Sequence, residues 1–291
     1  IDTSGEQAGA VHLLADGGNI KVDGRITANS TGKDDNGQHH KGGDIYIGRD
    51  KDTNALAAVG DVRGATLESK GGFVETSGEH LATDGISVTA KDWLLDPSDI
   101  TISSSASSNV TGTSPADITP NGGTGTSSSV QVSTIQTAIN AGTNVTIKTT
   151  NNSNATGAGN ITIATALNFN NTGATDATLK LSAVNGITQN AGASITATGS
   201  KLVNVIMDAQ GKYSGQDIND ANSKGITLNS TITTNGAVTL TGISKNTTGG
   251  FANSGIVFNS GSSVTASQFN ITGQQIIPSS SVEYVEAKIF A

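Results

Sequence analysis

The sequence predicts an all-β fold in which short strands stack as a parallel β-helix, or β-solenoid, with one short helix and loop excursions. Three observations predict this class. The 291 residues include 37 glycines but only 3% aromatic residues, so the core must be built from small aliphatic and β-branched side chains. Strand-length runs of alternating apolar and polar residues recur along the chain. In the last third, these runs belong to an internal repeat.

The alternating runs are short, and glycine or asparagine lies close to each of them. Examples begin at Asn19, Asp44, Gly85, Asp99, Asn144 and Asn160. Period two is typical of a strand with one buried face, and Gly and Asn favour tight corners between strands. Because helical patterns do not alternate with these runs, we expect a stack of strands rather than alternating strands and helices.

Three segments of the last third align with one another, each beginning with Gly-Ile and ending a short strand with Asn. We expect the isoleucines to face the core at equivalent positions, namely Ile187, Ile226 and Ile256. We expect the asparagines to stack as a ladder at one corner, namely Asn190, Asn229 and Asn259. With 208–224 and 243–254 set aside as loops, roughly twenty residues remain per coil, which suits one turn of a β-helix.

The chain divides into two expected β-helical segments, 1–102 and 132–291. Between them, residues 103–131 contain little but Ser, Thr, Gly, Asn and Pro, and Asp117 is their only charge. Such a composition offers little to bury, so we expect a linker or long excursion there, outside the regular coil.

The second segment is expected to begin with a short helix at about 133–141. Residues 133–136 have the pattern of a capping box, in which Ser133 would cap the first turn. Ile135, Ala138 and Ile139 follow at helical spacing, and Gly142 provides the stop.

The charge balance limits the classes of partner. With 24 acidic and 16 basic side chains, the formal net charge is -8, opposite to what nucleic acids or anionic membranes select, so we expect neither as a partner. The absence of cysteine excludes disulfides and thiolate chemistry. The chain starts at Ile1 without a leader pattern or an apolar span, so we interpret it as an internal or processed fragment without membrane insertion.

Catalytic patterns are sparse. From Trp93 to the end there is no His, Arg or Cys. The sequence contains no Gly-x-Ser-x-Gly elbow, phosphate-binding loop, dinucleotide fingerprint or HExxH motif. We therefore expect no catalytic residues, no cofactor and no enzymatic activity.

Two groups of residues have features of metal-binding sites. His39 and His40 are adjacent, but neighbours on an extended chain point apart, so a solvated loop is the favoured interpretation. Asp50, Asp52 and Asn54, with Asp61, copy part of a calcium-binding EF-hand loop, whose sixth position should be glycine. Because Ala occupies that position, a polar turn is favoured over calcium, which stays open as the alternative.

Two kinds of surface residue are candidates for function. Asn-x-Ser/Thr sequons, which are acceptors for glycosylation, begin at Asn29, Asn109, Asn144, Asn151, Asn154, Asn160, Asn170, Asn229, Asn246 and Asn270. Contact loops are expected at 31–43, 208–224 and 243–254. Their candidate contact residues are Lys212, Tyr213, Gln216, Asp217, Asn246 and Phe251. The single tryptophan, Trp93, is expected to cap or plug the first stack, with an exposed interaction anchor as the alternative.

Several short sequence motifs resemble those of one protein family. Residues 71–78 (GGFVETSG) and 93–97 (WLLDP), with similar motifs at 43–50 and 134–146, resemble the large adhesins and filamentous haemagglutinins exported by two-partner secretion. The resemblance covers residues 1 to about 150. It implies a right-handed β-helical shaft, export of the parent protein through an outer-membrane transporter, and a secreted location on the bacterial cell surface. It also implies adherence to a host-cell or neighbouring-cell receptor or glycan.

We therefore expect a non-catalytic adhesin shaft or adhesive module that makes contacts through exposed loops. A structural subunit of an extracellular filament or surface layer, joined by end-to-end self-association, is the alternative. A β-helical polysaccharide-degrading enzyme is a further alternative, and it would need clustered carboxylates in an open groove.

Overall fold

The computed structural model describes residues 1–50, 52–107, 110–112, 118–120, 127–149, 159–211, 225–245, 255–277 and 281–284. These residues are mostly strands, with one helix, and most strand pairs are parallel. The predicted all-β class with parallel strands is thereby confirmed.

Most strands of the described chain belong to three sheets. In spatial order, the first contains β1 (Val11–Leu13), β4 (Ile45–Ile47), β6 (Thr66–Ser77), β8 (Ser87–Asp96), β13 (Asn144–Lys148), β16 (Ala177–Ala183), β19 (Val203–Ala209), β22 (Ala237–Lys245), β25 (Gln268–Ile277) and β26 (Ser281–Tyr284), with β3 (Arg25–Thr27) beside β6. The second contains β2 (Asn19–Lys21), β5 (Val59–Asp61), β7 (His80–Ala82), β12 (Ser127–Gln131), β9 (Asp99–Ser103), β14 (Ile161–Ile163), β17 (Ile187–Gln189), β20 (Ile226–Leu228) and β23 (Ile256–Phe258). The third contains β15 (Leu167–Asn171), β18 (Ile195–Gly199), β21 (Thr231–Thr233) and β24 (Ser263–Thr265).

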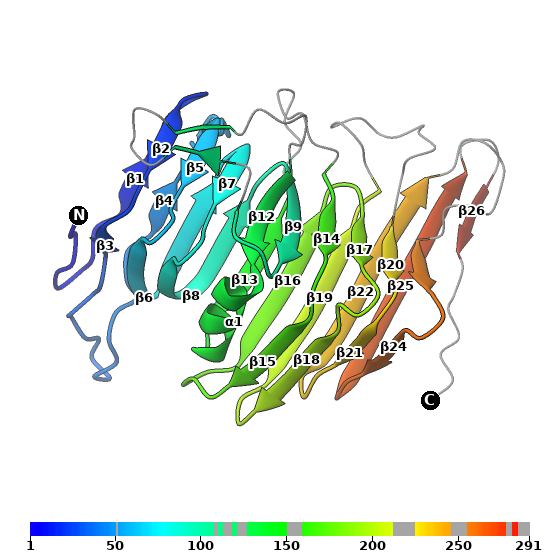
Figure 1. Ribbon diagram of the computed structural model, residues 1–291. Coiled ribbons are helices and arrows are strands. Elements are labelled where there is room, and N and C mark those ends of the chain that lie inside the picture. The colour runs from blue at the N-terminus through cyan, green and yellow to red at the C-terminus, as the bar shows by residue number, and fades with distance from the viewer. Residues whose placement is uncertain are drawn as a thin grey trace.

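From β13 onward the chain visits the three sheets in strict rotation. β13, β14 and β15 are followed by β16, β17 and β18, and the same order repeats to β25. Each passage adds one parallel strand to every sheet, so the strands of the first sheet run side by side along the molecule as the colour changes from blue to red (Figure 1).

The three sheets share one hydrophobic core, to which the strands contribute alternate side chains. In the first sheet, Val145, Leu179, Val205 and Val238 lie in register on successive strands and are fully buried. Most of the buried aliphatic residues belong to a single cluster that extends through all three sheets. Small β-branched side chains fill this core, as the composition predicts.

The repeat of the last third has the expected register. Ile187 pairs with Ile226, and Ile226 with Ile256; the first two are fully buried, and Ile256 is partly buried against the same core. The asparagine ladder forms in part. Asn259 donates to Asn229 Oδ1 at 2.6 Å, whereas the Asn229 amide donates to the Gln189 carbonyl at 2.8 Å.

Helix α1 (Val132–Asn140) lies within one residue of its predicted position. Ile135, Ala138 and Ile139 are buried, as their spacing predicts. The predicted capping box is wrong: Gln131 is the N-cap without a side-chain cap bond, so Ser133 lies inside the helix. The end follows the prediction. Gly142 has a φ of 90° and donates to the Ile139 carbonyl at 3.0 Å, closing the last turn.

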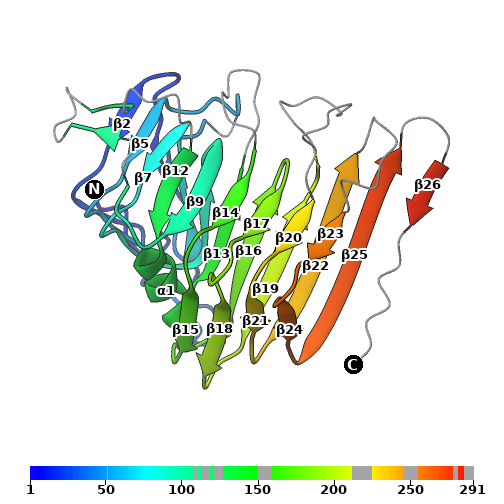
Figure 2. The ribbon, with the colours of Figure 1, turned by 45° about the vertical axis from the view of Figure 1, so that its right-hand side comes forward.

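The helix takes the place of a strand next to the third sheet. It lies beside β15 (Figure 2), where Gln136 Nε2 donates to the Asn168 carbonyl at 2.7 Å. Asn140 Oδ1 accepts a hydrogen bond from the backbone N–H of Asn170 at 2.7 Å. The helix side chains thus satisfy backbone groups of β15 that a neighbouring strand would otherwise bind.

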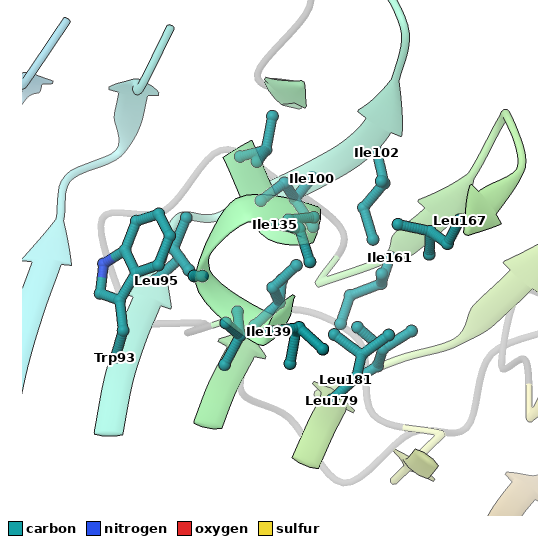
Figure 3. Packing of buried hydrophobic residues seen from close by; sticks show 14 of the residues in the cluster. Trp93, Leu95, Ile100, Ile102, Ile135, Ile139, Ile161, Leu167, Leu179 and Leu181 are labelled. Atoms are coloured by element: carbon teal, nitrogen blue, oxygen red, sulfur yellow. The ribbon is translucent and has the colours of Figure 1, made fainter. Parts of the chain in front are cut away.

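Trp93 lies in the interior of the stack. Its side chain is 1% exposed, and its strand neighbours are Val74 of β6 and Val145 of β13. Trp93 and Leu95 lie beside α1, in the cluster that contains Ile135 (Figure 3). Both predictions for Trp93, an end cap and an exposed anchor, are therefore wrong. The indole fills the space beside the helix and donates from Nε1 to Thr76 Oγ1 at 3.1 Å.

The expected excursion at 103–131 is shorter than predicted. Residues 127–131 form β12, which inserts between β7 and β9, and Ser103 pairs with Gln131. Val130 is fully buried in the core. Within the excursion, β10 (Val110–Thr111) and β11 (Thr119–Pro120) form a small antiparallel pair. The polar composition of residues 127–131 does not predict strand β12, because its serine hydroxyls form hydrogen bonds within the sheet. Ser128 Oγ, for example, accepts a hydrogen bond from Leu81 N at 3.0 Å.

Candidate functional site: a contact groove beside the 31–43 loop

The groove lies beside the first of the predicted contact loops. Its central depression, of about 820 Å³, is lined by residues that include Asn29, Thr31, His39, His40, Lys41 and Lys70. Two smaller depressions adjoin it. One shares His40 and Lys41 with the centre, and the other shares Ser4 and Asn29, so the three follow one another along the surface.

A finger of backbone forms one wall of the groove. His40 N donates to the Gly32 carbonyl at 3.0 Å, and Lys33 forms a bridge with His39. Asp34 closes the tip, because its Oδ1 accepts from the N–H groups of Asn36 and Gln38 at 2.9 Å each. Local polar residues thus build the finger, which projects from the sheets between β3 and β4 (Figure 1).

The floor of the groove is held by bonds between successive coils. Asn29 Oδ1 accepts from Lys70 N at 2.9 Å, and Asn29 N donates to Ser4 Oγ at 3.0 Å. Ser30 Oγ donates to the Glu6 carbonyl at 2.7 Å. Where the finger returns to the stack, a Cβ on Gly43 would lie 2.1 Å from the Gly9 carbonyl oxygen, so only glycine allows the coils to approach. The groove therefore has a fixed floor.

Basic side chains gather in the central depression of this acidic protein. Two lysines and two histidines line it, without any carboxylate. Lys70 Nζ lies 3.2 Å from Glu68, which also pairs with Arg25. Burial raises the pKa of the Glu68 carboxyl. Hydrogen bonds from Lys70 and Asn29 and the positive charges of Lys70 and Arg25 lower this pKa by a larger amount, so it lies below its usual value. Lys41 is exposed and forms no ion pair within the described chain.

The sequence motifs that carry the family resemblance come together in a cluster that is separate from the groove. Arg49 donates to Glu75 Oε1 at 2.8 Å and also binds Asp96 and Asn54. Ser77 Oγ donates to Glu75 at 2.7 Å, so residues from three separate motifs form one cluster. Arg49, Glu75 and Asp96 are all at least 93% buried. Lys148 Nζ also lies 3.5 Å from Asp96, so two cations face the two buried carboxylates of this ionic cluster, which suits a structural role.

The residues of the EF-hand-like pattern do not converge. Asp50 accepts from the N–H groups of Asp52 and Thr53, and these backbone bonds lower the pKa of its carboxyl. Asn54 binds Arg49, whereas Asp61 on β5 pairs with Lys21 at 3.2 Å. Residues 50 and 52–54 therefore fit a polar turn better than a calcium-binding loop. Residue 51 lies outside the described chain.

The sequons fall into three groups. Asn109, Asn151, Asn154 and Asn246 lie outside the described residues. Four others use their side-chain amides in bonds that hold the stack together, namely Asn29, Asn144, Asn160 and Asn229. Asn170 on β15 and Asn270 on β25 are exposed. These two side chains are the described acceptors that a glycosylating enzyme could reach without breaking a described side-chain bond.

The six predicted contact residues of the other two loops all lie outside the described residues. The groove rests partly on the predicted 31–43 loop, which contributes Lys41, and partly on Lys70, which sequence reasoning missed. One sequence signal pointed to this region: all histidines and arginines of the chain precede Trp93. That signal does not tell which of them share a surface.

Comparison with protein-family models, with curated proteins and with solved structures finds no match to this chain. Over the described ranges, no helix has the length and hydropathy that a membrane crossing requires. The same residues contain no group of three or more His, Asp or Glu side chains arranged to hold a metal ion.

Proposed function

We propose that the chain is part of a right-handed parallel β-helix that serves as a non-catalytic adhesive module on the bacterial cell surface. The rotation of the chain through three parallel sheets supports the β-helix. The motifs at 71–78 and 93–97 support membership of the two-partner-secretion family, in which the parent protein is exported through an outer-membrane transporter. The handedness, the export and the surface location are parts of this proposal.

The observation that carries the proposal is the contact groove. Its central depression combines four basic side chains with hydroxyl and amide groups on a floor fixed by bonds between coils. A rigid scaffold that presents such groups can bind a surface receptor or glycan through hydrogen bonds and charge attraction, without any reactive group. Single contacts of this kind are weak, so adherence would come from many copies together.

Binding to cells and glycans, measured with carbohydrate turnover on the same sample, tests this function. The variant combines His40→Gln with Lys41→Gln, and the matched control is Lys91→Gln, an exposed lysine on β8. We expect the double variant to lose adherence with an unchanged melting temperature, while the control keeps both. Adherence untouched by the double variant would place the contacts elsewhere, and turnover of the carbohydrate would contradict a non-catalytic module.

One observation favours the alternative of end-to-end assembly. At the C-terminal end of the described stack, Ile256, Val264, Phe269 and Ile271 pack against the core but are only partly buried. A further coil, or the end of another molecule, would bury these side chains and gain hydrophobic stabilisation. Sedimentation of the fragment over a range of concentrations distinguishes a monomeric module from a filament subunit.

The geometry offers little support for a polysaccharide-degrading enzyme. Such an enzyme needs a carboxyl group open to substrate, with a pKa suited to proton transfer. The clustered carboxylates Glu75 and Asp96 are buried and bound to Arg49. The central depression of the groove has no lining carboxylate.

A further inference from the structure

Three rings lie next to one another on the outer face of the first sheet, where β1, β4 and β6 run side by side (Figure 1). The centroid of the His12 ring is 4.9 Å from that of Tyr46, and the Tyr46 centroid is 5.6 Å from that of Phe73. Tyr46 lies between two buried isoleucines on β4, so its ring points away from the core. Trp93 and Phe169 are the aromatic residues that lie inside the core. We call His12, Tyr46 and Phe73 the ring ladder.

The ring ladder positions the carboxylate of Asp44. Tyr46 Oη donates to Asp44 Oδ2 at 3.4 Å, and the backbone carbonyl of Asp44 accepts from Val11 N at 2.9 Å. Burial, followed by the negative charges of Asp44 and Glu75, raises the pKa of the Tyr46 phenol above its usual value. The phenol therefore stays protonated at neutral pH and keeps its donor. Packing within the ring ladder limits the directions in which that donor can point.

The carboxylate of Asp44 differs from the neighbouring carboxylate of Glu75. Glu75 is 4% exposed and is bound by Arg49, whereas Asp44 is half-buried. Within the described residues, no salt bridge joins Asp44 to Lys41. A carboxylate has about four positions at which it accepts hydrogen bonds, and the described bond from Tyr46 takes one of them. Asp44 can therefore accept further hydrogen bonds from a ligand.

Asp44 lines one of the smaller depressions of the contact groove, with a volume of about 350 Å³. This volume lies within the range of small-molecule sites, roughly 300–1,000 Å³. Acidic, amide and basic side chains line it together, from Gln7, His40, Lys41 and Asp44. The glycines of its wall are bonded to neighbouring coils, because Gly42 N donates to the Lys70 carbonyl at 2.7 Å and Gly43 N donates to the Ala28 carbonyl at 2.8 Å. The wall is therefore fixed.

This combination of groups suits a neutral sugar. Two adjacent hydroxyl groups can each donate to one oxygen of the Asp44 carboxylate, and hydrogen bonds to a charged group are stronger than those between neutral groups. The Gln7 amide and the Lys41 ammonium can donate to hydroxyl or ring oxygens of the same sugar. A sugar that carries a carboxylate or sulfate would place this charge beside Asp44, and like charges in contact disfavour binding. The central depression has no lining carboxylate, so it cannot make this selection.

We propose that the smaller depression is a sugar subsite, in which Asp44 accepts hydrogen bonds from two adjacent hydroxyl groups of a neutral glycan and Tyr46 positions the carboxylate. This inference rests on the proposed adhesive function and specifies its ligand class. Asp44 decides the specificity of the groove, and Tyr46 is a positioning residue that acts through Asp44. No bond of the glycan is made or broken.

Binding of the whole fragment to immobilised neutral oligosaccharides that end in galactose, glucose or mannose tests the subsite. Asp44→Asn should weaken binding about tenfold, because it removes the charged acceptor. Tyr46→Phe keeps the ring and removes the donor, so it should weaken binding about threefold. Asp16→Asn, which neutralises an exposed aspartate, is the matched control and should bind like the parent. All three variants should keep the melting temperature of the parent.

Two further measurements separate this role of Asp44 from a structural one. In an alkaline absorbance titration, Asp44→Asn should lower the pKa of the Tyr46 phenol, because it removes a negative charge that raises this pKa, and Asp16→Asn should leave it unchanged. O-methylated versions of the same oligosaccharides, which lack hydroxyl donors, should bind at least tenfold more weakly than the parent sugars.

The outcomes distinguish the subsite from the adhesive function. Equal binding of the O-methylated sugars, or unchanged binding of Asp44→Asn to glycans that the parent binds, would overturn the subsite alone. A parent fragment that binds only acidic glycans would do the same. A parent fragment that adheres neither to cells nor to glycans would contradict the adhesive function together with the subsite.

Discussion

Replacing Ile226 with Asp tests the core register most directly. Ile226 is fully buried on β20, between Ile187 of β17 and Ile256 of β23. An aspartate there would lose the apolar contacts and place a carboxylate among aliphatic side chains without a charge partner. From both losses we expect the free energy of unfolding to fall by about 3–5 kcal/mol. The matched control is Thr227→Asp, one residue along the same strand on its outer face, where the change should stay within about 0.5 kcal/mol.

Thermal and urea unfolding measure this difference. A loss of 1 kcal/mol shifts the melting temperature by roughly 2–4 °C in domains of 150–250 residues, so Ile226→Asp should lower it by roughly 6–20 °C. Stacked coils can unfold in parts, so hydrogen exchange over β17 and β23 should show the loss locally. Equal effects of the two substitutions, or an unchanged melt of Ile226→Asp, would refute the inward placement.

The described contacts support three further predictions. Arg49→Ala should lower the free energy of unfolding by about 3–5 kcal/mol in urea, because Glu75 and Asp96 would stay buried without the guanidinium; a near-neutral effect would argue against the cluster. Brief proteolysis with mass spectrometry should find its first cuts within 104–126, because this segment has few apolar side chains; first cuts within 159–207 would contradict this. Burial raises the pKa of Asp61, but bonds from Arg63 and Lys21 lower it below 3.8 overall. Its stabilisation is therefore present above pH 3.8 and lost as the pH falls further, and Asp61→Asn should flatten that part of the stability profile.

Local patterns predicted the elements well where burial alternates along the strand. Ile187 and Ile226 face the core as expected, because a strand turns successive side chains to opposite faces regardless of its neighbours. The α1 helix was also predictable from apolar spacing and Gly142. Its start was not, because Gln131 at the end of β12 leads directly into the helix and no side chain caps it.

The candidate site was predictable only in part. The 31–43 loop was expected as a contact surface, and the tip of its finger follows from Asp34 and the turn residues behind it. Lys70 was missed because it is distant in sequence and reaches the groove through the packing of successive coils. The burial of Val110 and Ile118 was missed because these residues look isolated in a polar segment, and their burial depends on contact with Val59 and Ala82.

The sequence by itself determined the strand-rich class, the position of the helix and the scarcity of catalytic groups, because these depend on residue types and on periodicities of two or 3.6 residues. Only the tertiary structure decided which strands are neighbours. It inserted β12 between β7 and β9, gathered Arg49, Glu75 and Asp96 in one cluster, and buried Trp93 beside α1. The physical reason is that contacts between coils join residues about twenty or more positions apart, and their pairing depends on loop lengths and packing that local patterns do not encode.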